Sequence, residues 1–256
     1  MPTDCLAVIF SKLSLLDLTT AVPFVCKAWL QASSDPQCWK VLDFRISFPV
    51  FFNFALNRSR GAAVELRFPS HVSPSPEDLS LASQVCPGLK IVSLPRMGVD
   101  DEGHVLNLVE RWKQLEVLEM ESKPSVLPEM VKKIGLHCPN FHGLKLRGLI
   151  KKEDVAAIIC YLPKLQQLDL SCCRLGREQL VSLVEGCREL KRLMVCDCVG
   201  FEADEEVKRK ASGMEVFEHG GSRIEDDCEY DESVDEVDAL EQMFMYYDDC
   251  YVMWLL

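Results

Sequence analysis

Residues 165–170 read LQQLDL, and this short pattern is the key to the fold. In an extended chain Leu168 and Leu170 point to one side, whereas Gln167 and Asp169 point to the other. The same pattern, apolar-x-x-apolar-x-apolar, appears in LKIVSL (89–94), LEVLEM (115–120), FHGLKL (141–146) and LKRLMV (190–195). Weaker copies begin at Trp39, Ala63 and Met214. All these segments start 24 to 26 residues apart, which indicates a repeat protein.

Between the expected strands the apolar residues follow a helical period. Leu180, Leu183 and Cys187, for example, share one helical face. Each unit is therefore a strand and a helix that cannot bury their apolar faces alone, so neighbouring units must stack. Over roughly residues 39–222 the pattern resembles cysteine-containing leucine-rich repeats. That resemblance implies an α/β solenoid with parallel strands on a concave face and helices on a convex face.

The cysteines fit the repeat better than they fit a metal site. The chain has 13 cysteines, an odd number, and its first residues, MPTDC, are not typical of a secretory signal, so we expect a reduced intracellular protein rather than a disulfide framework. Cys86, Cys138 and Cys187 each stand three residues before a strand pattern, and Cys173 and Cys198 stand three residues after one. None shows the spacing of a zinc knuckle. We expect buried structural thiols, no metal and no cofactor.

Residues 1–44 precede the regular repeat and are predicted to form three short helices. The motif elements are Pro2-x-Asp4-Cys5-Leu6, Ile9-Phe10-x-x-Leu13, Asp17-Leu18, Val25-Cys26-Lys27-x-Trp29 and Trp39-x-x-Leu42. Together and in this order they resemble the F-box of plant F-box proteins with leucine-rich repeats. The family usually has Leu before the Pro, and here Met1 takes that place.

The resemblance implies that the helical segment binds a Skp-type adaptor and, through it, a cullin, while the repeats hold a protein substrate for ubiquitination. Such a small segment also has too little volume to hide all its large apolar groups. The predicted adaptor-binding residues are Pro2, Leu6, Ile9, Phe10, Leu16, Leu18, Val25 and Trp29. For Leu13, Trp39 and Leu42 the sequence favours a place in the core.

The strand positions that face away from the core would line the concave face. Six of them form the predicted substrate-binding set: Glu119, Lys145, Arg147, Gln167, Asp169 and Arg192. The three basic residues in this set suggest a substrate with an acidic segment. A solvated face of mixed charge is an equally good interpretation.

Charge is distributed unevenly along the chain. The 256 residues carry 28 Lys+Arg and 40 Asp+Glu, a formal net charge of −12. Twelve acids and no Lys or Arg follow Ile224, so residues 1–224 are formally neutral. No basic stripe indicates nucleic-acid binding, and no apolar run reaches the length of a membrane helix. The sequence contains neither a phosphate-binding loop nor a nucleophile elbow, the motifs that would indicate an enzyme. We therefore expect no catalytic residue.

Three regions are therefore expected: an F-box at 1–44, a solenoid at 45–222 and an acidic tail at 223–256. The tail composition predicts disorder, with docking onto the open end of the solenoid as the alternative. The predicted function is the substrate-recognition subunit of an SCF-type ubiquitin ligase in the nucleus, the cytoplasm or both. The alternative is a repeat scaffold that binds partners without recruiting a ligase.

Overall fold

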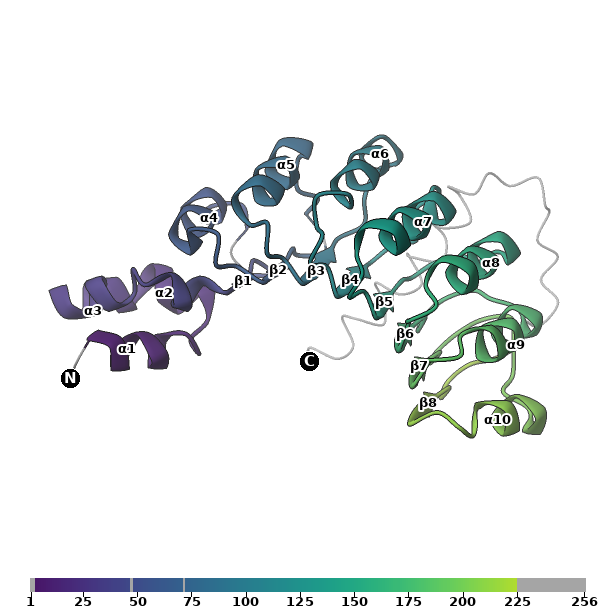
Figure 1. The fold of residues 1–256 in the computed structure, drawn as a ribbon. Helices are drawn as coiled ribbons and strands as arrows, with labels where there is room; N and C mark the ends of the chain where they lie inside the picture. Colours follow the sequence, from purple (N-terminus) through teal and green to yellow (C-terminus); the bar gives the residue numbers. More distant parts are fainter. Residues whose placement is uncertain (1–2, 47, 71, 225–256) are drawn as a thin grey trace.

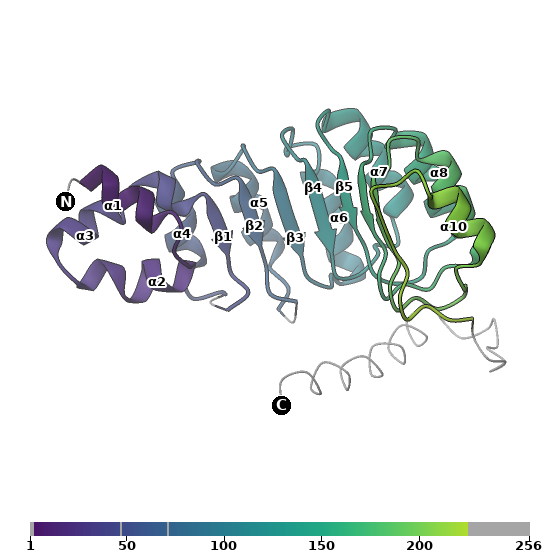
Figure 2. The ribbon, with the colours of Figure 1, turned by 90° about the horizontal axis from the view of Figure 1, so that it is seen from below.

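A computed structural model describes residues 3–46, 48–70 and 72–224. A small helical unit leads into an arc of repeats, in which the strands line the inner side and the helices cover the outer side (Figure 1). Within the described residues the strands form one parallel sheet in the order β1 to β8, and Figure 2 shows the strands of its first half side by side. This architecture confirms the predicted solenoid.

The strands are three or four residues long and coincide with the predicted segments. They are β1 (Val41–Asp43), β2 (Glu65–Arg67), β3 (Ile91–Leu94), β4 (Val117–Met120), β5 (Gly143–Lys145), β6 (Gln167–Asp169), β7 (Arg192–Met194) and β8 (Val216–Glu218). The weaker copies at Trp39, Ala63 and Met214 are thus real repeats.

A helix precedes each strand from β2 to β8. These helices are α4 (Phe52–Ser59), α5 (Pro76–Val85), α6 (Val99–Leu108), α7 (Leu127–His137), α8 (Lys152–Tyr161), α9 (Arg177–Gly186) and α10 (Glu205–Ala211). Local sequence sets where several of them begin. Ser75 accepts a hydrogen bond from the Asp78 backbone and the Asp78 carboxylate accepts one from Ser75, so a capping box starts α5. None of the described helices is long and apolar enough to cross a membrane.

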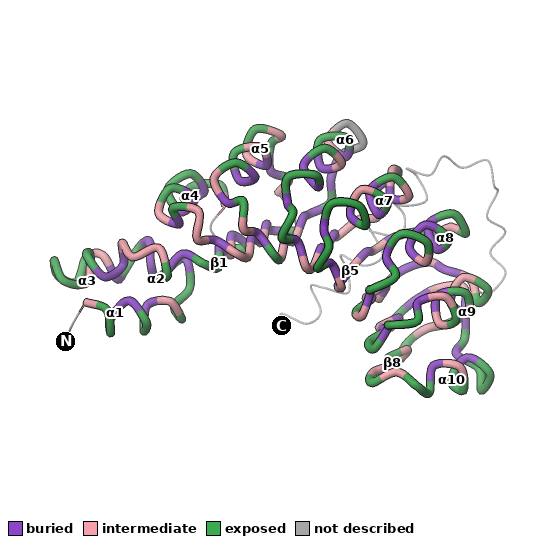
Figure 3. The backbone as a smooth tube through the Cα atoms, viewed as in Figure 1, coloured by how far each residue is buried: buried purple, intermediate pink, exposed green. Residues whose placement is uncertain are grey.

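The core runs between the strands and the helices, as the buried stretches in Figure 3 show. The middle residue of each strand lies in register with the next, as in Leu118, Leu144 and Leu168, and these three are at most 2% exposed. Each strand thus buries the apolar row of its neighbour, which a single repeat could not do.

The N-terminal unit consists of α1 (Thr3–Phe10), α2 (Leu15–Thr20), η1 (Val22–Phe24), α3 (Lys27–Ala32) and η2 (Pro36–Trp39). Ser14 caps α2 by accepting a hydrogen bond from the Asp17 backbone at 3.1 Å. Trp39 is 1% exposed and its indole donates to the Ser33 carbonyl at 2.8 Å. The predictions that Trp39 and Leu42 belong to the core are confirmed.

An aromatic cluster lies at the first repeats, close to the helical unit. Phe44, Phe48, Phe52 and Phe68 have ring centroids 5.1 to 6.4 Å apart. Trp39 contributes a further edge contact to Phe54 of α4 at 5.7 Å. The four phenylalanine rings pack the core of the first two repeats, and the Trp39–Phe54 contact joins the first repeat to the helical unit.

The substitution Phe44→Ala tests the packing of this aromatic cluster. Phe44 is fully buried among three other rings, so we expect the free energy of unfolding to fall by about 3–5 kcal/mol. Urea unfolding followed by circular dichroism would measure it. Ile46→Ala, two residues away at an 84% exposed position, should change it by less than about 0.5 kcal/mol. Equal effects from the two variants would contradict the packing described.

Candidate functional site

Helix α1 is apolar on two faces, but the protein covers only one of them. Leu6, Ala7 and Phe10 point into the helical unit and are at most 6% exposed. On the other face Val8 and Ile9 are 61% and 48% exposed. A helix that is apolar all round is normally buried on all sides, so the uncovered face indicates a partner.

The structure separates the eight predicted adaptor-binding residues into groups. Ile9, Leu16 and Val25 are exposed and accessible to a partner. Trp29 is half-buried, with its ring edge-on to Phe10 at 5.0 Å.

The remaining four residues of that set are not on the described surface. Leu6, Phe10 and Leu18 are 6%, 2% and 1% exposed. They cannot contact a partner unless the helical unit opens. In this structure they form the core that supports the exposed residues. A simple apolar count could not make this distinction, because α1 carries apolar residues on both faces. Pro2 lies outside the described residues.

Four further apolar side chains of this unit are exposed and were not assigned to the surface from sequence. They are Val8, Leu13, Phe24 and Leu30. The prediction that Leu13 is a core residue is wrong: α1 ends at Phe10, so Leu13 lies in the following turn and is 37% exposed. Of the sixteen large apolar residues that are exposed in the described chain, seven fall between residues 8 and 30. We call these seven the N-terminal apolar surface: Val8, Ile9, Leu13, Leu16, Phe24, Val25 and Leu30.

A groove of about 490 Å³ extends this surface toward the first repeat. Its lining is mostly apolar and includes Phe24 and Leu30 from the helical unit and Phe54 from α4. Arg58 stands in the same lining, with its guanidinium over the Phe54 ring at 5.1 Å. The groove therefore combines aromatic walls with one positive charge.

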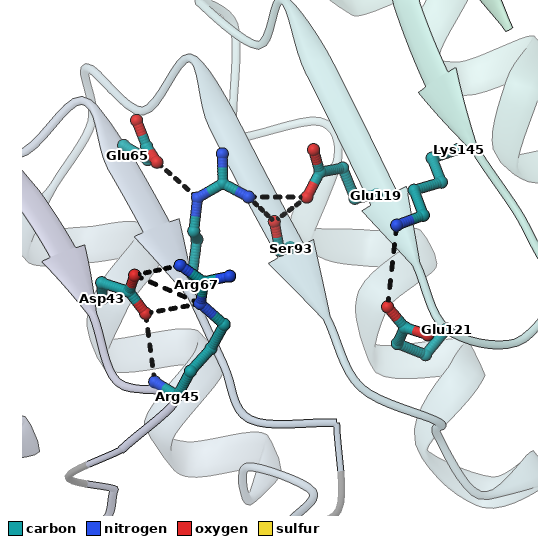
Figure 4. A network of polar contacts seen from close by, with 8 residues as sticks. All are labelled: Asp43, Arg45, Glu65, Arg67, Ser93, Glu119, Glu121 and Lys145. Carbon is teal, nitrogen blue, oxygen red and sulfur yellow. Dashed lines mark hydrogen bonds and ion pairs between the residues drawn. The ribbon is translucent and has the colours of Figure 1, made fainter. Parts of the chain in front are cut away.

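The concave face carries charged side chains that pair across neighbouring strands (Figure 4). Arg67 bonds to Glu65 on its own strand and to Glu119 two strands away, the latter at 2.8 Å. Ser93 of the intervening strand also hydrogen-bonds to Glu119. Although burial works against it, the two carboxylates raise the pKa of Arg67. In this part of the concave face the positive and negative side chains therefore neutralise one another.

The six predicted substrate-binding residues lie on or just after β4, β5, β6 and β7, strands that line the inner side of the arc (Figure 1). Arg147 approaches Glu121 at 3.2 Å and Lys145 approaches the same carboxylate at 4.0 Å, so one acid offsets part of both charges. Glu119 is held by Arg67, and Asp169 accepts a hydrogen bond from the Ser171 backbone. Gln167 and Arg192 are exposed. Among the described residues Arg192 forms no ion pair.

An apolar strip crosses the middle of this face. Ile91, Val117 and Gly143 are adjacent in register on β3, β4 and β5. A side chain at Gly143 would place its Cβ 2.9 Å from a Val117 methyl group, so Val117 occupies the space beside the glycine. The candidate residues selected from sequence were polar or charged and did not include this strip. The register of the repeat pattern places all three residues on the concave face, but the selection of candidates there kept only polar and charged side chains.

The cysteines serve as buried parts of the repeat. The Cys138 thiol lies 3.4 Å from the Trp112 carbonyl, and the Cys173 thiol lies 3.3 Å from the Leu146 carbonyl. Burial raises the pKa of Cys138 and of Cys187 to about 11. In the parts of the chain that the structure describes, no group of His, Cys, Asp or Glu is placed to hold a metal ion.

These environments predict selective alkylation. At pH 8 a thiol with a pKa of about 11 is ionised in roughly one molecule in a thousand. We therefore expect iodoacetamide to modify the exposed Cys5, Cys26 and Cys160 well before Cys138 or Cys187, as read by peptide mass spectrometry. Denaturant should remove the difference. Early modification of Cys138 in the folded chain would contradict its buried position.

Comparison with known proteins finds similarity both in the helical unit and over most of the chain. Residues 1–41 match the F-box domain family. An F-box/LRR-repeat protein from Arabidopsis thaliana is 28% identical over 217 residues, covering 76% of this chain and 70% of the relative. The Arabidopsis F-box protein FBW2 is 29% identical over 232 residues, covering 84% of this chain and 72% of the relative.

Among solved structures, an internalin from Listeria monocytogenes aligns with a TM-score of 0.38 at 12% identity. The alignment covers 67% of this chain and 58% of the internalin. That score is too low to add to the description of the fold.

Proposed function

From an F-box domain at the N-terminus and relatives that are plant F-box/LRR-repeat proteins, we propose that this chain is the substrate-recognition subunit of an SCF-type ubiquitin ligase. The F-box binds a Skp-type adaptor, which connects it to a cullin. The repeat domain binds the protein to be ubiquitinated. The observation that carries the proposal is the N-terminal apolar surface on a domain that matches the F-box family.

The chemistry of that surface suits a permanent protein partner. Val8 and Ile9 expose 61% and 48% of their area on α1, whose other face is already packed, and Val25 exposes 59% in the turn after η1. Covering apolar area yields about 25 cal/mol per Å². Monomeric proteins seldom leave contiguous apolar patches in water without a function, so an adaptor that brings apolar side chains of its own would be bound by this surface.

The concave face supports the second half of the proposal. It presents the apolar strip of Ile91, Val117 and Gly143 beside a row of paired charges. Interfaces commonly combine an apolar centre with a polar rim. Because Lys145 and Arg147 share Glu121, the face matches a substrate segment with apolar residues and mixed charges better than a purely acidic one.

The mechanism follows from the rigidity of the connection. Trp39 of η2 packs against Phe54 of α4 at 5.7 Å and its indole donates to the Ser33 carbonyl, so the first repeat is joined to the F-box helices and a bound substrate would keep a fixed position relative to the adaptor. Holding two reactants together raises their effective concentration. The receptor accelerates ubiquitin transfer by position and contributes no reacting group.

The thiols support a nuclear or cytoplasmic location for this activity. All eleven cysteines in the described residues are free, and such thiols persist in reducing compartments. A scaffold that binds partners without a ligase is the second candidate function, and it is favoured only if the N-terminal apolar surface fails to bind the adaptor.

Adaptor binding tests the proposal directly. The purified full chain and a purified Skp-type adaptor should form a one-to-one complex, measured by titration calorimetry. Ile9→Asp and Val25→Asp each place a charge on the exposed surface, so we expect affinity to fall about 10- to 100-fold. Both positions are exposed, so circular dichroism should show the fold unchanged.

Leu136→Asp is the matched control. Leu136 lies on α7 of the solenoid and is 70% exposed, so the same change far from the F-box should leave adaptor affinity as it was. Failure of the unaltered chain to bind would sink the ligase proposal and leave the scaffold. Equal losses from all three variants would show that the effect is not specific to the N-terminal apolar surface.

A further inference from the structure

The groove beside the N-terminal apolar surface is built from both the helical unit and the first repeat. Phe24 of η1 and Leu30 of α3 contribute to its lining from the helical unit, and Phe54 and Arg58 contribute from α4. Helix α4 packs against η2, the last element of the helical unit. Residues 1–41 match the F-box family, so α4 lies beyond that match and the groove crosses its boundary.

The groove combines a buried base with exposed aromatic side chains. Leu18, Ser33 and Trp39 in its lining are buried, so the groove rests on the packed core of the helical unit. Phe24 and Phe54 are 78% and 42% exposed, the two largest exposed fractions of any Phe, Tyr or Trp side chain in the described residues. Both of them line this one groove. Large apolar rings left in water at one place indicate that a partner covers them.

Arg58 gives the groove an unbalanced positive charge. Its Nη1 donates to the Ser34 hydroxyl and its guanidinium lies over the Phe54 ring at 5.1 Å, so both of these contacts are to neutral groups. Among the described residues Arg58 forms no ion pair, and none of those that line the groove is acidic. A guanidinium held in place beside apolar side chains is suited to bind a carboxylate. The groove therefore fits a segment that carries an apolar side chain next to an acid.

The occupant follows from continuity with the N-terminal apolar surface. Phe24 and Leu30 belong to that surface and also line the groove. Val25, which the proposed function assigns to the adaptor contact, directly follows Phe24 in the chain. A partner that covers Val25 therefore lies next to a side chain that lines the groove.

We propose that the adaptor contact does not end at the F-box but continues through the groove onto α4 of the first repeat. A segment of the adaptor places an apolar side chain against Phe24 and Phe54 and a carboxylate on the Arg58 guanidinium. This inference rests on the proposed function, because it names further residues for the same partner. It assigns part of the repeat domain to the adaptor interface.

A contact of this kind would also restrain the junction between the two units. In the free chain the Trp39–Phe54 contact at 5.7 Å joins them. An adaptor that contacts Phe24 and Phe54 together spans the same junction from the outside. The position of a bound substrate relative to the adaptor is then fixed more firmly in the complex than in the free chain, which favours transfer.

Hydrogen exchange tests this footprint without any substitution. The full chain is measured by mass spectrometry with and without a purified Skp-type adaptor. Amides of α1 and of α4 should both exchange several-fold more slowly in the complex, whereas α5, the next helix of the solenoid, should be unaffected. Protection of α1 without α4 would overturn the inference. Equal protection of α4 and α5 would indicate a general stabilisation and would overturn it as well.

Charge reversal at Arg58 tests the expected carboxylate. Arg58→Glu should weaken adaptor binding about tenfold or more in titration calorimetry. Arg60→Glu is the matched control, because Arg60 is exposed two residues away, does not line the groove and undergoes the same change of charge. It should alter the affinity by less than about twofold. Equal losses from the two reversals, or no loss from Arg58→Glu, contradict the inference.

A neutral variant gives a second measurement that does not depend on introducing an acid. Arg58→Gln removes the charge from the groove, so its adaptor affinity should fall less steeply with added salt than that of the unaltered chain. Circular dichroism checks that each variant is folded. Identical salt dependence of the two chains would show that Arg58 meets no carboxylate in the complex, against the inference.

The inference and the proposed function fail in different ways. If the unaltered chain forms no complex with the adaptor, the proposed function fails and the inference fails with it. If a complex forms and Ile9→Asp weakens it, while Arg58→Glu has no effect and α4 gains no protection, the adaptor contact ends at the F-box. In that case the inference alone is overturned.

Discussion

Everything in this molecule depends on one constraint, which is that no repeat can bury its own apolar row. A strand of three or four residues and a helix of about ten leave leucines exposed unless another unit lies against them. The parallel register provides that cover, because Leu118, Leu144 and Leu168 stand level on adjacent strands. The stability of each repeat therefore depends on its neighbours, and the two ends of the array become the places where special solutions are required.

At the first end of the solenoid, aromatic side chains fill the core and connect the repeats to the helical unit. Phe44 packs among the rings of the first two repeats, and Trp39 of η2 packs against Phe54 of α4. The Trp39 contact joins the F-box helices to the solenoid. One set of buried rings thus serves both the stability of the repeats and the geometry that the proposed function requires.

The N-terminal apolar surface and the concave face differ in the kinds of side chain that they expose. The N-terminal apolar surface presents uncharged aliphatic and aromatic groups, which gain free energy mainly by leaving water. The concave face presents charges already paired by the protein, as Arg67 is with Glu119, around a strip of small and β-branched residues. Paired charges cost less to cover than isolated ones and still discriminate between partners. The arrangement suits a constant partner at one end and a selective one along the arc.

The repeat, its register and its inward-facing row of residues can be predicted from the amino acids alone, because alternation along a strand and periodicity along a helix are local properties. LQQLDL specifies its own inward and outward residues before any neighbour is known. The motif elements of residues 1–42 likewise indicated the F-box. The packing of separate segments determines which face of α1 is covered, and it places Phe10 inside and Ile9 outside. It also decided that Arg67 reaches Glu119, a residue 52 positions away, because contacts of that kind arise only when separate repeats stack.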